Sequence, residues 1–167
     1  MDYPGSLETI AEIAVALAGF SALVALLATK DQARRKFEAL GLQVMLEASL
    51  FVVALSLLPV VLFELGLAAG TVWRSSAAIF LIVDIAITVS VRMRSRGWSE
   101  HFGSGERIVA PATSILSSIA DGLMLWVLVD YGVGSPSGVY LLALYLNLLL
   151  AGILFVRFAA TNLVPAE

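Results

Sequence analysis

The chain has 167 residues, of which 60% are hydrophobic and only 14% are charged, with a net charge of −3 and a mean hydropathy of +0.96. About a quarter of the residues of a typical soluble domain are charged, so this composition excludes a water-soluble globular protein and predicts an integral membrane protein. Because the chain has no cysteine and a single histidine, disulfides, thiolate metal sites and histidine-rich metal sites are also excluded. We expect no cofactor, no metal and no nucleic-acid partner.

Five apolar segments are long enough to cross the hydrocarbon core of a bilayer, which takes a helix of about 20 residues. They are uninterrupted and show no alternation with a period of two, which predicts helices rather than strands. We therefore expect a single all-α domain, a bundle of five transmembrane helices. In chain order the segments are 8–29, 40–64, 74–92, 109–130 and 138–158.

The first two segments each contain a glutamate. Segment 8–29 is interpreted as a membrane span and not as a cleaved signal peptide, because basic residues follow it and none precedes it. Its Glu12 is expected near the membrane surface. In the second segment, Glu47 lies about 10 Å inside the inner boundary if the depth is counted at 1.5 Å per residue. Pro59 is expected to kink the same helix.

The third and fourth segments each carry an aspartate well inside the apolar stretch. Asp84 precedes the end of its segment by about eight residues, which gives it nearly the same depth as Glu47. Asp121 precedes the end of its segment by about nine residues, in the other half of the membrane, at the depth of Asn147 in the fifth segment. The sequence thus predicts two polar tiers, an inner one with Glu47 and Asp84 and an outer one with Asp121 and Asn147.

Each of these polar residues shares a helix face with small or polar neighbours at spacings of three, four or seven residues. Such faces are typical of helix surfaces that pack against other helices rather than against lipid. The serine-rich face of the fourth segment also predicts a polar connection between the two depths. The four faces are Gln43, Glu47 and Ala54; Ala77, Asp84 and Thr88; Ser114, Ser117, Ser118 and Asp121; and Tyr140, Ala143, Asn147 and Ala151.

The acids inside the segments have no basic residue of their own chain at the same depth, because no Lys or Arg lies within a segment. Intramembrane acids usually pair with a base, a cation or water, so three interpretations stay open. The acids are neutral and hydrogen-bonded to polar side chains, since burial disfavours the charged form. Alternatively, they line a hydrated path for protons or cations, or they contact a cationic residue of another subunit. Asn147 is interpreted as a hydrogen-bonding residue of the helix packing.

The basic residues lie almost entirely on one side of the predicted membrane. Nine of the ten Lys and Arg residues flank the same side, and only Arg74 lies on the other. By the positive-inside rule, the N-terminus is outside and the C-terminus is cytoplasmic, in a multi-pass protein of a prokaryotic inner (plasma) membrane. Arg92, Arg94 and Arg96 are expected to contact anionic lipid headgroups.

Enzymatic activity is not expected. A Ser/His/Asp set would need His101, which lies in a predicted cytoplasmic loop far from Asp121. Intramembrane aspartyl chemistry needs two carboxyl groups at one depth, which Glu47 and Asp84 meet by the depth estimate, but no motif flanks them. The loop sequence HFGSGER lacks the Lys-Ser/Thr pair and the preceding strand of a phosphate-binding loop.

Five short helices enclose little volume, so we expect a homo-oligomer or a place in a larger membrane complex, with lipids as the other partners. The leading hypothesis is a small oligomeric channel or transport-type protein with an acidic proton or cation path through the membrane. The alternative is a non-catalytic accessory subunit whose acids dock basic residues of a partner span. The residues assigned to the path, or else to polar contacts between helices, are Glu47, Asp84, Asp121, Ser114, Ser118 and Asn147.

Overall fold

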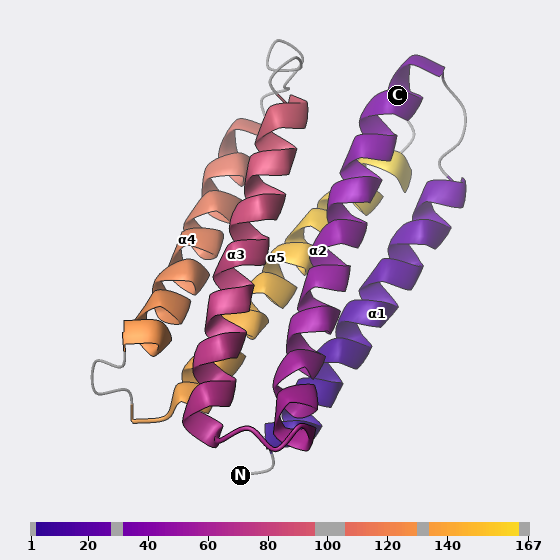
Figure 1. Cartoon of the computed structure of the whole chain (residues 1–167). Helices are drawn as coiled ribbons and strands as arrows, with labels where there is room; N and C mark the ends of the chain where they lie inside the picture. The colour runs from indigo at the N-terminus through magenta and orange to yellow at the C-terminus, as the bar shows by residue number, and fades with distance from the viewer. Residues whose placement is uncertain (1–2, 28–31, 96–105, 130–133, 164–167) are drawn as a thin grey trace.

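The computed structural model describes residues 3–27, 32–95, 106–129 and 134–163, and this part of the chain forms five α-helices. The all-α bundle expected from the sequence is confirmed. In chain order the helices are α1 (Tyr3–Leu27), α2 (Gln32–Glu64), α3 (Ala69–Ser95), α4 (Glu106–Val129) and α5 (Pro136–Leu163) (Figure 1).

Helix α5 is the centre of the bundle. It packs against each of the other four helices and crosses behind α2 and α3 in the view of Figure 1. Helix α1 packs mainly on α2 and α5, and α4 packs mainly on α3 and α5, so these two helices form opposite edges. The N-terminus and the C-terminus mark opposite ends of the bundle (Figure 1), as an odd number of antiparallel helices requires.

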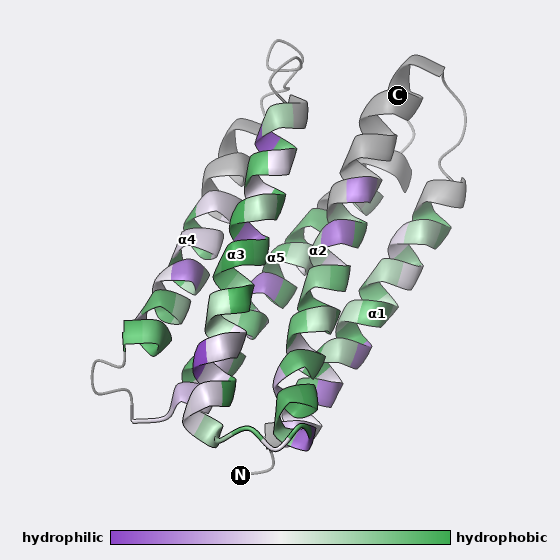
Figure 2. Cartoon of the chain, in the orientation of Figure 1, coloured by the Kyte–Doolittle hydropathy of each residue, from purple (hydrophilic) through white to green (hydrophobic). Residues whose placement is uncertain are grey.

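Four helices contain stretches long and apolar enough to cross a membrane, namely Pro4–Val24, Met45–Glu64, Ala69–Met93 and Pro136–Val156. Within the described residues, α4 contributes a shorter apolar stretch, Thr113–Val129. Hydrophobic positions dominate along the helices, with hydrophilic positions between them (Figure 2). The chain is therefore a small multi-pass integral membrane protein.

The helices extend beyond the apolar segments from which they were predicted. Helix α2 begins at Gln32, eight residues before the apolar segment 40–64, and α3 begins at Ala69, five residues before the segment 74–92. A helix is held by hydrogen bonds within its own backbone, so it continues into polar residues that lie outside the hydrocarbon. The ends of these helices consequently do not mark where the apolar segments end.

Gly66 ends α2 with a Schellman motif. Its φ angle is +79°, which glycine adopts without the steric cost that a Cβ atom brings. The amide of Gly66 donates to the carbonyl of Phe63 at 2.9 Å, and the amide of Leu67 donates to the carbonyl of Leu62 at 3.3 Å. These two bonds satisfy the last carbonyls of α2 and turn the chain toward α3.

Aromatic side chains from α2, α3 and α5 fill the core where these three helices meet. The rings of Phe51 and Phe80 lie 5.1 Å apart in an edge-to-face arrangement. Tyr140 of α5 contacts both Trp73, at 5.7 Å, and Phe80, at 6.4 Å. Tyr140 and Phe80 are fully buried, so this cluster joins the central helix to its two neighbours.

Tyr140 also compensates for the proline inside α2. The helix continues through Pro59 to Glu64, but proline has no N–H with which to bond the carbonyl four residues earlier, that of Leu55. The Tyr140 hydroxyl donates a hydrogen bond to this carbonyl at 2.9 Å, in a buried position. A side chain from a neighbouring helix thus satisfies the backbone group that proline leaves unpaired, which is how membrane helices tolerate proline.

Candidate functional site

Two aspartates and a serine meet at the interface between α3 and α4. Asp84 is only 9% exposed. The hydroxyl of Ser117 donates a hydrogen bond to Asp84 Oδ2 at 3.2 Å. The carboxyl group of Asp121, one turn beyond Ser117 on α4, lies close enough to the carboxyl group of Asp84 for the two to interact electrostatically. Asp84 and Asp121 are called the acid pair. Together with Ser117 they form the candidate site.

The position of Asp84 beside Asp121 corrects the predicted depths. The sequence analysis placed Asp84 with Glu47 and Asp121 with Asn147, because each depth was counted from the end of its own apolar segment. The helices are longer than those segments, and α3 and α4 run antiparallel from Ser95 and Glu106. Asp84 lies eleven residues before Ser95, and Ser117 lies eleven residues after Glu106. The two positions therefore stand at the same level, with Asp121 one turn away.

A hydrogen bond between two carboxyl groups requires a proton on one of them. A carboxylate only accepts hydrogen bonds, whereas a protonated carboxyl group also donates one. Two negative charges at contact distance in a medium of low dielectric constant also repel strongly. Two neighbouring carboxyl groups in such a medium are more stable when they share one proton, as other carboxyl pairs do. Asp121 Oδ1 is shielded from solvent and has no hydrogen-bond partner among the described residues.

The two serines assigned to the path lie on the exposed face of α4. Ser114 and Ser118 are exposed on the single chain, so their predicted packing against other helices is not provided by the described helices of this chain. Helix α4 buries Ala120, Met124 and Val127. At 100° per residue, Ser117 is the serine nearest this buried face and Ser118 the furthest from it. Ser117 is consequently the serine whose hydroxyl reaches Asp84. The sequence pattern included Ser117 on the serine-rich face but did not indicate which serine of that face contacts the acid.

Asn147 takes no part in the candidate site. It is 7% exposed, and its side-chain amide donates to the carbonyl of Ala143 on its own helix at 3.1 Å. Tyr140, Ala143 and Ala151, which share its face, are also buried. The predicted burial of this face of the fifth segment is therefore confirmed.

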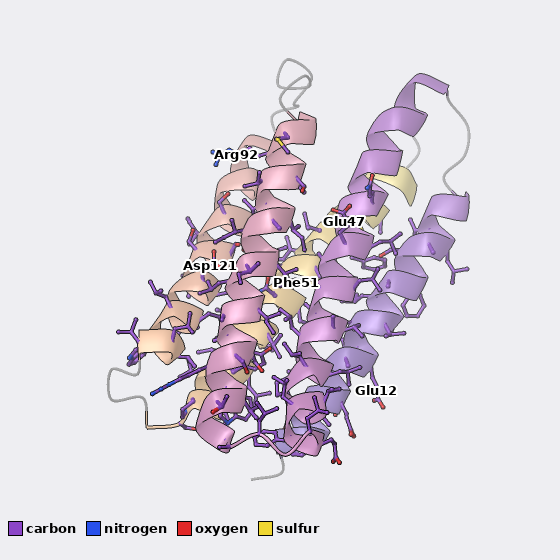
Figure 3. The ribbon with its side chains drawn as sticks, in the orientation of Figure 1. Glu12, Glu47, Phe51, Arg92 and Asp121 are labelled. Carbon is purple, nitrogen blue, oxygen red and sulfur yellow. The ribbon has the colours of Figure 1, made fainter. Side chains whose placement is uncertain are left out.

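Glu47 lies on the other side of α3 from the acid pair. It belongs to α2, whereas Asp121 belongs to α4, and α3 stands between the two labelled side chains (Figure 3). Glu47 is partly buried and accepts a hydrogen bond from Gln43 Nε2 at 2.9 Å. It lies two residues inside the apolar stretch Met45–Glu64, closer to the membrane boundary than the sequence suggested. Glu47 and Asp84, which the sequence predicted at a similar depth, thus lie on different sides of α3, where Asp84 contacts Ser117 of α4.

The arginines predicted to contact headgroups are only partly described. Arg92 is exposed near the end of α3 that leads to α4 (Figure 3). Arg94 is described only as part of the α3 backbone, and Arg96 and His101 lie outside the described residues. In the described part of the chain, no group of three His, Cys, Asp or Glu residues is placed to hold a metal ion.

No protein-family model matches this chain, and no curated protein or solved structure is significantly similar to it. The interpretation of the acid pair therefore depends on its own geometry and chemistry.

Proposed function

We propose that the protein is a small transport-type membrane protein in which the acid pair and its serine exchange protons or bind cations in transit. The observation that carries the proposal is the contact between Asp84 and Asp121 inside apolar helices, held by Ser117. Acids inside a membrane are costly, and those that occur often mark ion pathways and proton relays. Two neighbouring carboxyl groups that share one proton can accept or release it with little rearrangement of the helices.

The outer face of α4 suggests where the rest of the path runs. Ser114 and Ser118 are exposed on a single chain, next to the partly buried Asp121. If a second copy covers this face, its surface and the serine hydroxyls together form a polar route from the acid pair along α4. The proposed path is thus an interface between copies, with the N-terminus outside and the C-terminus in the cytoplasm. The proposed path does not include Glu47 or Asn147.

Proton flux in liposomes tests this function. The purified full-length protein is reconstituted with a pH-sensitive dye inside the vesicles, and a pH difference is imposed across the membrane. We expect wild-type protein to dissipate the difference, and Asp84→Asn or Asp121→Asn to reduce the flux to that of empty liposomes, because an amide cannot carry the proton. The matched control is Glu12→Gln, which removes an exposed acid of α1 and leaves the flux unchanged. Unchanged flux in both aspartate variants would contradict the proposal.

The second candidate is a non-catalytic accessory subunit of a larger membrane complex. The observation that favours it is also on α4, where Ser114, Ser118 and Gly122 are exposed at a spacing of four residues. Small residues at this spacing let another helix approach closely, and Asp121 at the edge of the face can receive a basic residue of a partner.

Co-purification distinguishes the accessory subunit from the transport protein. In the accessory role, a second membrane protein purifies with the wild type and is lost from Asp121→Asn, because its basic residue no longer has an acid to pair with. The same preparation then shows no proton flux when reconstituted alone. Wild-type protein that purifies as a stable homo-oligomer without another chain counts against this role.

A further inference from the structure

The exposed face of α5 carries a tyrosine in the middle of the apolar stretch. Tyr145 is 55% exposed and lies between Leu142 and Leu149, which are also exposed. It is nine residues inside Pro136–Val156, about 13 Å from the nearer end at 1.5 Å per residue. Tyrosine is typical of membrane surfaces, where its hydroxyl contacts water. From this depth the side chain is too short to bring its hydroxyl to either surface.

The Tyr145 hydroxyl has no hydrogen-bond partner within the described part of the chain. Lipid hydrocarbon offers none, and a hydroxyl group without a partner is costly there. The buried side of α5 packs against the other helices of the bundle, so its exposed side faces lipid or another protein. Tyr145 therefore indicates a polar neighbour outside its own chain.

Helix α4 presents a surface of small residues that the chain itself leaves open. Ser114, Ser118 and Gly122 are exposed at a spacing of four residues. A Cβ atom at Gly122 would meet no atom of the rest of the bundle within 4 Å. The packing of the single chain therefore does not require glycine here, although glycine weakens a helix. Small residues at this spacing let a neighbouring helix approach closely.

The candidate site aligns α4 with α3 in depth. The hydroxyl of Ser117 donates a hydrogen bond to Asp84 at 3.2 Å, and the two helices run antiparallel (Figure 1). Seven residues from this contact toward the Val129 end of α4, Met124 is consequently level with Ala77 of α3.

Aromatic contacts align α5 with the same point of α3. The ring of Tyr140 contacts the rings of Trp73 and Phe80 at 5.7 and 6.4 Å. Ala77 lies near the middle of the interval between these two residues. Tyr140 of α5 is therefore at nearly the depth of Met124 of α4.

This alignment puts Tyr145 at the depth of the small surface of α4. Tyr145 lies five residues beyond Tyr140, and the α4 position at the same depth lies five residues before Met124, between Ser118 and Gly122. Copies related by a rotation axis along the membrane normal share all depths. A neighbouring copy can thus place its tyrosine directly opposite this gap.

We propose that copies of the chain associate head to tail, with Tyr145 of one copy inserted between Ser118 and Gly122 of the next. The tyrosine hydroxyl exchanges a hydrogen bond with the Ser118 hydroxyl, since each group can both donate and accept. The two faces belong to different helices, so every copy carries one of each and the contact repeats from copy to copy. The contact rests on the proposed function for the assembly of identical copies, and it assigns α5 as the helix that covers the path along α4.

Cysteine cross-linking tests the contact, because the chain has no cysteine of its own. Two differently tagged full-length copies, one with Tyr145→Cys and the other with Ser118→Cys, are co-expressed and oxidised in isolated membranes. We expect a disulfide that joins the two tags, since the contact brings the substituted positions within the short range that a disulfide needs. Either variant expressed alone is expected to form no cross-link.

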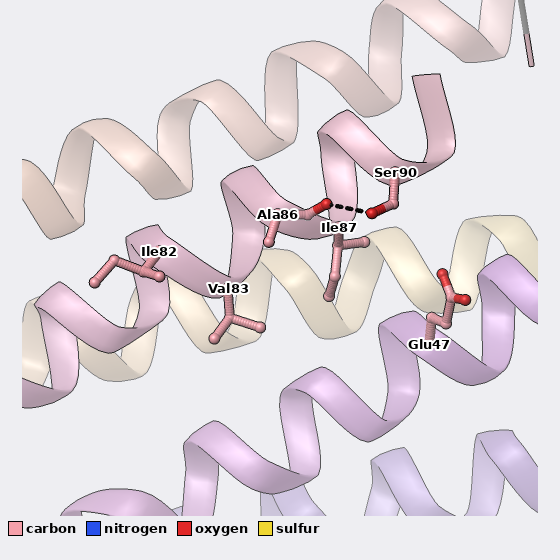
Figure 4. A pocket seen from close by; sticks show the side chains of 6 residues that line it. All are labelled: Glu47, Ile82, Val83, Ala86, Ile87 and Ser90. Atoms are coloured by element: carbon pink, nitrogen blue, oxygen red, sulfur yellow. Dashed lines mark hydrogen bonds between the residues drawn. The ribbon is translucent and has the colours of Figure 1, made fainter. Parts of the chain in front are cut away.

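The matched control pairs Ser118→Cys with Ile82→Cys. Ile82 is 67% exposed and lies two residues from Asp84, so it is close to Ser118 in depth. It belongs to α3, where it lines a groove between α2 and α3 (Figure 4). Random collisions in the membrane affect both pairs equally, whereas the proposed contact joins only Tyr145 to Ser118. We expect no cross-link in the control pair.

Energy transfer between fluorescently labelled copies in liposomes measures the strength of association. Tyr145→Phe keeps the ring and removes the hydroxyl, so we expect association weaker by about three- to tenfold, the scale of one hydrogen bond between membrane helices. Gly122→Leu fills the gap on α4 and is expected to abolish energy transfer. The single chain has room for this side chain, and far-ultraviolet circular dichroism verifies the fold of both variants.

Each of the other outcomes overturns the contact. A cross-link in Tyr145→Cys alone shows that α5 packs on α5 of the second copy. Absence of the mixed cross-link shows that lipid or another surface covers Tyr145. Equal cross-linking of the Ile82 control shows collisions without a specific contact, and wild-type energy transfer in Gly122→Leu places the association elsewhere.

Proton flux separates this contact from the proposed function. Flux that depends on Asp84 and Asp121, without the mixed cross-link, refutes the contact and supports the function. The mixed cross-link together with a wild type that conducts no protons supports the contact and refutes the function.

Discussion

Replacing Tyr140 by alanine is expected to lower the free energy of unfolding by about 3 to 5 kcal/mol, the range for aromatic-to-alanine changes in a packed core. Tyr140 is fully buried on the central helix, and its ring contacts Trp73 of α3 at 5.7 Å. Its loss leaves a cavity where three helices meet and removes the partner of the Leu55 carbonyl. Reversible unfolding in mixed micelles with increasing SDS, followed by tryptophan fluorescence, measures the change. Tyr145→Ala is the control, since Tyr145 is exposed on the same helix.

The conservative variant Tyr140→Phe separates the hydrogen bond from the packing. It keeps the ring but leaves the Leu55 carbonyl unpaired, at an expected cost of about 1 kcal/mol, the usual scale for a side-chain hydrogen bond in a membrane bundle. In a Pro59→Ala background the helix regains the N–H that bonds Leu55, so the same change should cost much less. A cost that is equal in both backgrounds would show that Tyr140 does not compensate for Pro59.

Lysine at position 84 is expected to be tolerated only while Asp121 remains acidic. In Asp84→Lys the new ammonium lies beside the Asp121 carboxylate, and the two form an ion pair inside the bundle. The double variant Asp84→Lys/Asp121→Asn has no acid at this contact, and removing one member of a buried pair costs about 3 to 5 kcal/mol. We therefore expect the double variant to be less stable than Asp84→Lys by this amount in the same SDS unfolding experiment.

A matched pair of variants controls for unrelated effects of the asparagine. Asp121→Asn is compared in the background of Glu12→Lys, where the new lysine is exposed on α1 and far from α4. In the Glu12→Lys background, Asp121→Asn is expected to change the free energy of unfolding by no more than it does in the wild type. If Asp84→Lys is equally stable with either residue at position 121, the two side chains do not contact each other, and the proposed proton-sharing pair is wrong.

The amino-acid sequence by itself determined that the chain is embedded in a membrane and that it forms helices. Both properties are local. An apolar stretch such as Met45–Glu64 is long enough to span the hydrocarbon, and backbone groups in lipid must be satisfied within their own helix. The burial of the face of α5 that carries Asn147 was also predictable, because small residues at helical spacing mark packed surfaces. These inferences need no knowledge of the neighbouring helices.

Only the tertiary structure decided which polar residues meet. Asp84 lies beside Asp121 and not beside Glu47. The helices extend beyond their apolar segments, and α3 directs Asp84 toward α4. A shift of one residue rotates a side chain by 100° around the helix, so Ser117 reaches the acid and Ser118 does not. The contact between Tyr140 and the Leu55 carbonyl joins residues 85 positions apart. Such pairings depend on how whole helices dock, and no short sequence pattern records them.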